Sequence, residues 1–328
     1  MRGRVAVLTT GGTIASLYDP VTKRHKAAAD GESLLAALPR RPPDIEIALE
    51  NVLQVHSFNM SCAQSLVLAA RLRERLAAAG VLGAVVTQGT DTLEENAYLL
   101  DLILDVGKPV VLTGAQLPAD HPQSDGPRNL ADAIDAAGAP AMAGQGVTVC
   151  FNGQIHAARD VTKLHASALE SFTSLGHGAL GAVDEGRVTV YRRMPPRPCH
   201  TLTDLRAWVP LIRLVMDSDS LLLDAAIEAK VDGLVIEGFG RGNVVASFTP
   251  RIAAAIKRDI PVVVTSRCPE GRVKPIYGTG GGGRELEDAG VIFAGDLKGA
   301  KARLLLMVLL STGLSGGRIL EAFNQHAL

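Results

Sequence analysis

Short apolar runs alternate with longer stretches of helical periodicity along most of the chain, and this alternation strongly constrains its fold. Strands buried on both faces of a parallel sheet read as continuous runs of Val, Ile and Leu rather than as alternating patterns. Strands separated by helices therefore predict an α/β architecture with a mostly parallel sheet. The runs that fit this description are residues 4–8, 83–87, 109–113, 147–151, 233–237 and 261–265.

Three helical stretches are predicted between these runs. The stretch 65–79 is expected to close at Gly80, since glycine readily adopts the left-handed backbone that ends many helices. A second stretch covers 91–105. A third covers 252–258 and follows Thr249-Pro250, a suitable cap and first-turn pair.

The alternation breaks at residues 191–205, which contain three prolines and three arginines and show little apolar periodicity. Such a segment is typical of an interdomain linker. We therefore predict a larger N-terminal domain over 1–190, a linker over 191–211 and a smaller α/β domain over 212–328. Hydrophobic residues make up 47% of the 328, enough for a sizeable core.

The composition excludes several classes of partner. With 33 basic and 34 acidic residues the formal net charge is -1, so we expect neither nucleic acid nor a membrane as a partner, because both attract a clustered basic excess. No stretch is apolar enough to span a bilayer, and no signal-peptide pattern precedes the first strand. The four cysteines lack CxxC or metal-ligand spacing. We expect a cytoplasmic chain with reduced thiols, no metal and no other cofactor.

Three of the predicted strands end in segments that place hydroxyl or amide groups beside glycine. In open α/β sheets, ligands bind outside the carboxyl ends of the strands, so this coincidence predicts a ligand site. The segments are LTTGGTIAS at 8–16, VVTQGTDTLEENAYLL at 85–100 and VVLTGAQLP at 110–118.

The threonines in these segments have two interpretations. Threonine caps helices well, and Asp91 with Glu94 fits a capping box at the start of the second helix. Alternatively, one hydroxyl is a nucleophile, with Thr13 presented by the glycine turn and Thr9 and Thr10 supporting that turn. A nucleotide cradle is not supported, because GGTIAS does not fit the GxGxxG pattern and no GxxxxGK[ST] motif is present. Backbone N–H groups at such turns can still hold a carboxylate or an oxyanion.

A threonine nucleophile needs a base or a charged neighbour to activate it. Lys163, which follows the strand 147–151, is the candidate, since a desolvated lysine can lose its proton near neutrality. Its alternative interpretation is an exposed surface lysine. His156 and His165 flank the same segment and are read as structural or surface residues.

The motifs TGGTIAS (10–16) and TQGTDTLEENAYLL (87–100) resemble the two signature motifs of the bacterial-type L-asparaginase family. The likeness covers most of the chain, because SDGPRNLADAI (124–134), NGQIHAARDVTKLHAS (152–167) and EGFGRGNV (237–244) also resemble blocks of that family. The resemblance implies a flavodoxin-like, mostly parallel sheet in the N-terminal domain and a smaller C-terminal α/β domain.

The resemblance also implies an amidohydrolase that works by double displacement. Thr13 attacks the side-chain amide, ammonia leaves, and water hydrolyses the acyl-threonine ester. Lys163 then tunes the hydroxyl of Thr90, and Asp91 pairs with the α-amino group of the substrate. The catalytic set implied in this way is Thr13, Tyr18, Thr90, Asp91 and Lys163.

The same resemblance implies how substrate is bound and how the chain assembles. Ser57 holds the α-carboxylate, and the backbone carbonyl near Ala115 meets the amide. The family forms homotetramers as dimers of dimers, and Asn243 matches a residue that reaches over from the C-terminal domain of a neighbour. The substrate-binding set is Ser57, Gly89, Thr90, Asp91, Ala115 and Asn243.

The chain departs from the family pattern at two places. The tyrosine that activates the nucleophile in relatives would fall near His25-Lys26, so either Tyr18 fills this role from a differently shaped loop or activation differs. The glutamate contributed by a neighbouring copy has no clean match, and Glu285 and Glu287 are its candidates. Phe58 follows Ser57 where some relatives carry a polar side chain.

The leading functional prediction is hydrolysis of L-asparagine, with L-glutamine as a secondary substrate. A dual glutaminase-asparaginase is the first alternative, because one methylene changes discrimination by only about 1–3 kcal/mol. The amidase subunit of a tRNA-dependent amidotransferase shares the motifs but is expected to carry an added RNA-facing domain, for which 328 residues leave no room. A non-catalytic amino-acid-binding protein on the same scaffold is the alternative from another class.

Overall fold

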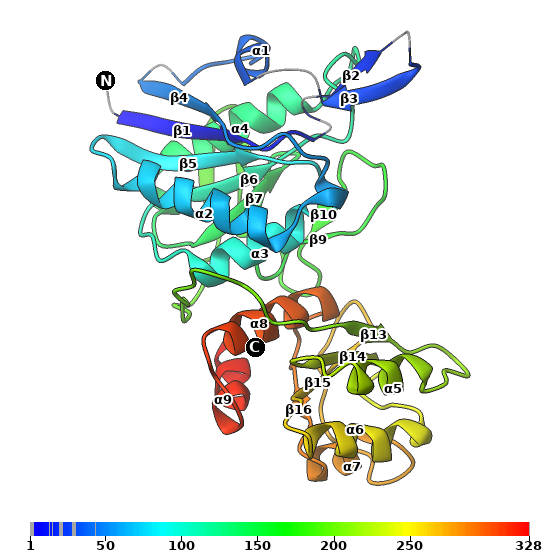
Figure 1. Ribbon diagram of the computed structural model, residues 1–328. Coiled ribbons are helices and arrows are strands. Elements are labelled where there is room, and N and C mark those ends of the chain that lie inside the picture. Colours follow the sequence, from blue (N-terminus) through cyan, green and yellow to red (C-terminus); the bar gives the residue numbers. More distant parts are fainter. Residues whose placement is uncertain are drawn as a thin grey trace. The chain divides into compact units, whose positions relative to one another are not determined.

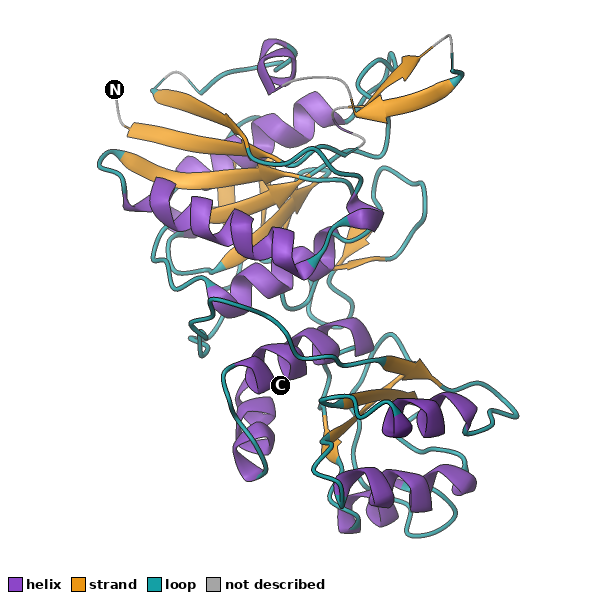
Figure 2. Ribbon diagram, viewed as in Figure 1, coloured by secondary structure: helices purple, strands orange, loops and turns teal. Residues whose placement is uncertain are grey.

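A computed structural model describes residues 3–12, 14, 16–19, 22–27, 31–42 and 44–327. The chain divides into two compact units, Met1–Pro196 and Arg197–Leu328. Pro196 lies inside the Pro- and Arg-rich segment that interrupts the alternation of strands and helices. Each unit is an α/β structure, as predicted (Figures 1 and 2).

In the described part of the first unit, a sheet of eight strands runs in the order β12-β11-β8-β7-β6-β5-β1-β4. The five strands from β4 to β7 are parallel, and β8, β11 and β12 extend the sheet with antiparallel pairing. Counted along the chain, the parallel strands have the order 2-1-3-4-5 of flavodoxin-like sheets. The strands are β1 (Gly3–Thr9), β4 (Ile45–Asn51), β5 (Val81–Thr87), β6 (Val110–Thr113), β7 (Val147–Phe151), β8 (Gln154–Ala157), β11 (Gly181–Asp184) and β12 (Arg187–Val190).

Helices cover both faces of this sheet (Figure 1). α2 (Cys62–Ala77) and α3 (Leu93–Ile103) pack on one face, and α1 (Gly31–Ala36) and α4 (Gly126–Gly138) on the other. Leu34 and Leu35 of α1 join Leu130 and Ala133 of α4 in one core cluster with Val5 and its strand neighbours.

α2 begins three residues before its predicted start because the sequence carries a capping box just upstream. Ser61 Oγ accepts from the backbone N–H of Gln64 at 3.3 Å, and Gln64 Oε1 accepts from the backbone N–H of Ser61 at 2.9 Å. Leu68, Leu72 and Leu76 then recur at helical spacing and are buried. Gly80 has a left-handed backbone, with φ of 76°, but α2 ends at Ala77 with Ala78 in the cap position, so the predicted closure of the helix at Gly80 is wrong.

The second unit has a smaller parallel sheet with helices around it (Figure 2). Its four described strands follow chain order, β13-β14-β15-β16. α6 begins at Thr249 itself, with Phe248 in the cap position, so the predicted cap at Thr249 is wrong by one residue. The elements are β13 (Leu211–Arg213), α5 (Leu221–Glu228), β14 (Leu234–Gly238), α6 (Thr249–Ile256), β15 (Val262–Ser266), α7 (Gly283–Asp288), β16 (Ile292–Phe293), α8 (Gly299–Ser311) and α9 (Gly317–His326).

Two hairpins extend from the first unit near the carboxyl ends of its strands. β2 (Ser16–Asp19) pairs with β3 (Arg24–Ala27) directly after the first glycine turn. β9 (Thr162–Lys163) pairs with β10 (Phe172–Thr173), and Lys163 lies opposite Phe172. Phe172 packs on Phe151 of β7 with ring centroids 4.8 Å apart, which anchors this hairpin to the sheet.

The order in which the chain adds strands to the parallel part of the first sheet reverses between β1 and β5. β4 pairs with one edge of β1 and β5 with the other, and Thr9 lies opposite Thr87. Threonine hydroxyls tie these strand ends together: Thr10 Oγ1 donates to the Thr87 carbonyl at 2.9 Å, and Thr9 Oγ1 donates to Asn51 Oδ1 at 2.7 Å. Thr9 and Thr10 therefore support the turn, as predicted. Ligands of such sheets bind outside this switch point.

The two turns at the switch point meet through their backbones. Gly12 has φ of 93°, and a Cβ placed on it would overlap the backbone nitrogen of Gly89. Gly89 is equally confined, because its Cβ would lie 2.6 Å from Ser57 Oγ. Glycine at position 12 is what allows the segments after β1 and β5 to lie in contact, and glycine at position 89 leaves room for Ser57.

We expect Gly12→Ala to lower the free energy of unfolding by about 2–5 kcal/mol. The left-handed backbone accounts for about 1–2 kcal/mol and the overlap with Gly89 for about 1–3 kcal/mol. Gly313→Ala isolates the first term, since Gly313 has φ of 80° and its Cβ would meet none of the described atoms within 4 Å. Urea denaturation checks this, and equal losses in the two variants would contradict a confined contact at Gly12.

Candidate active site

Three segments far apart in the sequence meet at the carboxyl end of β5. They are the turn 88–92 that follows β5, the short 3-10 helix Ser57–Asn59, and the strand β9. The turn after β1 joins them through the contact between Gly12 and Gly89. The site is thus built on strand ends and helix starts, which hold side chains more rigidly than a free loop would.

Lys163 is the central cation of this arrangement. Its Nζ donates to Thr90 Oγ1 at 2.8 Å and to Asp91 Oδ1 at 3.0 Å. Its backbone N–H donates to Glu94 Oε2 at 2.5 Å, which ties β9 to the first turn of α3. The side chain of Lys163 is only 16% exposed, so the predicted alternative of a solvated surface lysine is wrong.

A lysine ammonium in this position changes the chemistry of the threonine next to it. Thr90 Oγ1 accepts from Lys163, so its own hydrogen remains available to a ligand or a water molecule. Thr90 is 5% exposed, and in such a weakly hydrated place a cation stabilises the negative charge that develops on an oxygen losing its proton. The pair can therefore promote attack by a hydroxyl or a water.

Ser57 joins the cluster through Asp91. Its Oγ accepts from the backbone N–H of Asp91 at 3.2 Å and lies 3.4 Å from Asp91 Oδ2, to which it donates. Ser57 is buried, whereas the Asp91 side chain is 52% exposed. Asp91 thus links the serine to Lys163 and keeps a carboxylate face open to a ligand.

The predicted capping box of Asp91 and Glu94 is wrong. α3 starts at Leu93 rather than at Asp91, with Thr92 in the cap position, and among the described residues no side chain caps it. The carboxylates that the capping box would use are instead directed to β9: Asp91 pairs with Lys163 Nζ and Glu94 accepts from the Lys163 N–H. Tertiary contacts have overridden the local capping pattern.

The predicted nucleophile Thr13 lies outside the described residues. Its neighbours are described: Gly12 contacts Gly89, and Ile14 is buried against Gly126 at the start of α4. Tyr18 lies in β2, directly opposite His25 of β3, and its side chain is outside the described part of the chain. The two regions that the sequence offered for activating Thr13 therefore face each other across one hairpin.

Ala115 lies buried in the turn that follows β6. Asp125 holds this turn, because its carboxylate accepts from the backbone N–H groups of Gln116 at 3.1 Å and Leu117 at 2.9 Å. Asn129 Nδ2 donates to the Gly114 carbonyl at 3.0 Å and to Asp125. Asp125 and Asn129 had no predicted role, although an aspartate before Gly126-Pro127 at a helix start is a recognisable signal.

Asn243 belongs to the second unit and is not among the residues gathered around Lys163. Its Oδ1 accepts from the backbone N–H of Gly283 at 3.2 Å. Glu285 Oε2 accepts from the N–H of Gly281 at 2.9 Å, and Glu287 pairs with Arg284. Within this unit Asn243 and Glu285 bind backbone N–H groups at the start of α7 and just before it, and Glu287 pairs within the helix.

Family models match almost the whole chain. The model for the asparaginase N-terminal domain matches residues 4–196, and the model for the glutaminase/asparaginase C-terminal domain matches residues 208–323. The chain belongs to the asparaginase family.

Individual relatives agree with this assignment. An L-asparaginase of Bacillus licheniformis is 36% identical over 96% of this chain and 98% of its own length. A probable L-asparaginase of Deinococcus radiodurans is 39% identical over 98% and 97%. A subunit of the glutamyl-tRNA(Gln) amidotransferase of Haloquadratum walsbyi is 34% identical over 92% of this chain but only 70% of its own length. The chain is thus an asparaginase-family amidohydrolase.

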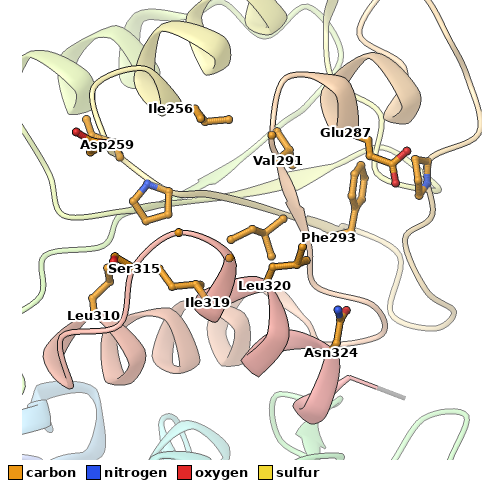
Figure 3. A pocket seen from close by; sticks show the side chains of 17 residues that line it. Ile256, Asp259, Glu287, Val291, Phe293, Leu310, Ser315, Ile319, Leu320 and Asn324 are labelled. Atoms are coloured by element: carbon orange, nitrogen blue, oxygen red, sulfur yellow. The ribbon is translucent and has the colours of Figure 1, made fainter.

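The asparaginase-family chain also has a pocket of about 680 Å³, which lies in the second unit (Figure 3). Apolar side chains such as Val291, Phe293 and Ile319 line much of it, with Asp259 and Glu287 among its polar residues. None of the residues gathered around Lys163 lines this pocket. Convergent polar groups, rather than pocket size, therefore locate the candidate active site of this family member.

Two negative findings apply to the described residues of this asparaginase-family chain. They contain no group of three or more His, Cys, Asp or Glu side chains placed to hold a metal ion. They also contain no helix long and apolar enough to cross a membrane.

The two histidines near Lys163 have the placements predicted for them. His156 is buried, with its Nδ1 3.0 Å from Ser174 Oγ, and has a structural placement. His165 is exposed and lies at the surface.

The cysteines of this asparaginase-family chain differ in exposure. Burial raises the pKa of the Cys150 thiol well above its usual range, because the thiolate would lose its hydration. Cys199 and Cys268 are exposed. A raised pKa keeps Cys150 protonated and weakly reactive.

We therefore expect a thiol reagent at mild alkaline pH to label Cys199 and Cys268 in the native protein and to label Cys150 only after unfolding. Peptide mapping after labelling under native and denaturing conditions checks this expectation. Rapid native labelling of Cys150 would contradict its burial in the core beneath α4.

Proposed function

We propose that this asparaginase-family amidohydrolase converts L-asparagine to L-aspartate and ammonia through an acyl-threonine intermediate on Thr13. The observation that carries the proposal is the pair of hydrogen bonds from Lys163 Nζ to Thr90 and Asp91, placed beside the contact between Gly12 and Gly89. The names of relatives with near full-length coverage, L-asparaginase and probable L-asparaginase, support the choice of substrate.

The polar groups around Asp91 suit the two charges of a free amino acid. When substrate binds, the Ser57 hydroxyl, next to the backbone of Gly89, turns its one hydrogen from Asp91 Oδ2 to the substrate α-carboxylate. The exposed face of the Asp91 carboxylate pairs with the α-ammonium group. The turn at Ala115, held by Asp125, offers a carbonyl to the amide N–H of the substrate side chain. A substrate bound at both ends is oriented for attack.

In the first chemical step, Thr13 Oγ bonds to the side-chain amide carbon. The carbon–nitrogen bond then breaks, and the leaving NH2 group takes up the proton that Thr13 has lost and departs as ammonia, so the aspartyl group is esterified to Thr13. In the second step water attacks the ester, and the departing Thr13 oxygen recovers a proton. We assign the proton transfers at Thr13 to Tyr18 of the β2–β3 hairpin, with Thr90 and Lys163 activating the water.

We further propose that the chain works as a homotetramer built as a dimer of dimers. In this assembly Asn243, from the C-terminal unit of a neighbour, completes the site of the first chain. We place the protein in the cytoplasm, since its cysteine spacing shows no disulfide framework.

One other reaction, hydrolysis of L-glutamine, is supported by a specific observation. The C-terminal family model is described as glutaminase/asparaginase, so a dual activity on L-glutamine is the second candidate. The amidotransferase relative of Haloquadratum walsbyi aligns with nearly all of this chain, but the match leaves 30% of that protein uncovered. A non-catalytic amino-acid-binding protein is the remaining alternative.

Ammonia release from L-Asn, D-Asn and L-Gln distinguishes these functions. We expect the highest kcat/KM on L-Asn, and we expect Thr13→Ala to lose at least about a thousandfold in kcat because the nucleophile is removed. Calorimetry should still detect L-aspartate binding to the folded variant. Wild-type turnover by Thr13→Ala would exclude Thr13 as nucleophile, and binding without any turnover by the wild type would establish the non-catalytic alternative.

Lys163→Met tests the role of the central cation. We expect kcat to fall by about 10²–10⁴-fold, since removal of a positioned acid–base group typically has this effect. Lys108→Met is the matched control, because Lys108 Nζ also donates to an oxygen, the Leu76 carbonyl at 2.6 Å, in a place unrelated to the site. Steady-state ammonia release measures both, and similar losses in the two variants would contradict a specific role for Lys163.

A further inference from the structure

Thr92 occupies the cap position of α3 without capping it. Within the described residues its hydroxyl forms no cap hydrogen bond, although a threonine at this position ordinarily caps the first turn. Instead, Thr92 Oγ1 donates to the backbone carbonyl of Ser57 at 2.7 Å. The hydroxyl that could stabilise its own helix is directed to the serine of the candidate active site.

Two buried amide side chains form a hydrogen-bond network with this hydroxyl. Gln88 Nε2 donates to Thr92 Oγ1 at 3.2 Å, and Asn96 Nδ2 donates to Gln88 Oε1 at 2.5 Å. Gln88 is 1% exposed and Asn96 4% exposed. Two amide side chains removed from water need such partners, because an unsatisfied buried polar group is costly.

The Ser57 carbonyl, the final acceptor of this network, determines which group donates in each of its hydrogen bonds. The Ser57 carbonyl can only accept, so Thr92 must donate its single hydroxyl hydrogen to it. Thr92 Oγ1 then has only lone pairs left for Gln88, which must present its amide NH₂. Gln88 Oε1 consequently faces Asn96 and accepts from it. The network therefore has one orientation, in which Thr92 Oγ1 donates to the Ser57 carbonyl.

We propose that Thr92, oriented by Gln88 and Asn96, is a positioning residue that holds Ser57 for recognition of the substrate α-carboxylate. This inference rests on the proposed function. Thr92 binds the backbone carbonyl of Ser57, while the backbone N–H of Asp91 and the backbone of Gly89 lie next to the Ser57 side chain. Loss of the Thr92 hydroxyl leaves the chemistry at Thr90 and Lys163 in place and loosens only the carboxylate site.

The kinetic signature of this role differs from that of a structural one. An interaction made equally in ground and transition states lowers KM and leaves kcat unchanged, so its loss raises KM. A variant that is merely less stable has a smaller folded fraction, which lowers the apparent kcat and leaves KM as it was. A variant that raises KM and leaves kcat unchanged therefore indicates a positioning role, whereas one that lowers the apparent kcat and leaves KM unchanged indicates a structural role.

The test compares Thr92→Val, Thr92→Ser and Thr148→Val. Thr92→Val keeps the shape and removes the hydroxyl, and Thr92→Ser restores the hydroxyl. Thr148 is a buried threonine of β7 whose Oγ1 donates to the Val110 carbonyl at 3.4 Å, so Thr148→Val makes the same chemical change inside the same unit.

We expect Thr92→Val to raise KM for L-asparagine and the dissociation constant of L-aspartate about tenfold, with kcat changed less than about twofold. Thr92→Ser and Thr148→Val should keep both constants within about twofold of the wild type. An unchanged KM in Thr92→Val, an equal rise in Thr148→Val, or no recovery in Thr92→Ser would overturn the proposal. If the wild type releases no ammonia, the proposed function fails, and L-aspartate binding by calorimetry still decides the role of Thr92.

Discussion

The contact between the turns that leave β1 and β5 is the constraint on which the rest of the site depends. Adjacent parallel strands end side by side, but their following segments usually diverge toward opposite faces at a topological switch point. Here Thr10 bonds to the Thr87 carbonyl, and Gly12 lies against Gly89. The segments of the candidate active site thereby remain together after the sheet has ended.

Lys163 brings a third part of the chain to this contact. It lies on a hairpin that Phe172 anchors on Phe151, and its backbone is tied to Glu94 at the start of α3. The start of α3 thus contacts both sides of the site: Glu94, in its first turn, binds Lys163, and Thr92, in its cap position, binds Ser57. The side chains of Glu94 and Thr92, which could cap their own helix, instead bind Lys163 and Ser57, which are distant in sequence.

Much of the framework could be predicted, because apolar runs report burial directly. β7 has its predicted ends, Val147 and Phe151, and the strands before both glycine turns lie where expected. The start of α3 could not be predicted, because Asp91 and Glu94 satisfy a local capping pattern while their partner, Lys163, is distant in sequence. The roles of Asp125 and Thr92 likewise depend on contacts that residue spacing does not reveal.

We propose that the glycine turn after β1 carries the nucleophile and that the cluster around Lys163 serves it. The most direct measurement is peptide mapping by mass spectrometry after the protein, mixed with excess L-asparagine, is quenched in acid within its turnover time. We expect an aspartyl ester on the peptide that contains Thr13, and we expect this ester to be absent in Thr13→Ala. An ester on Thr90, or turnover without any acylated threonine, would contradict it.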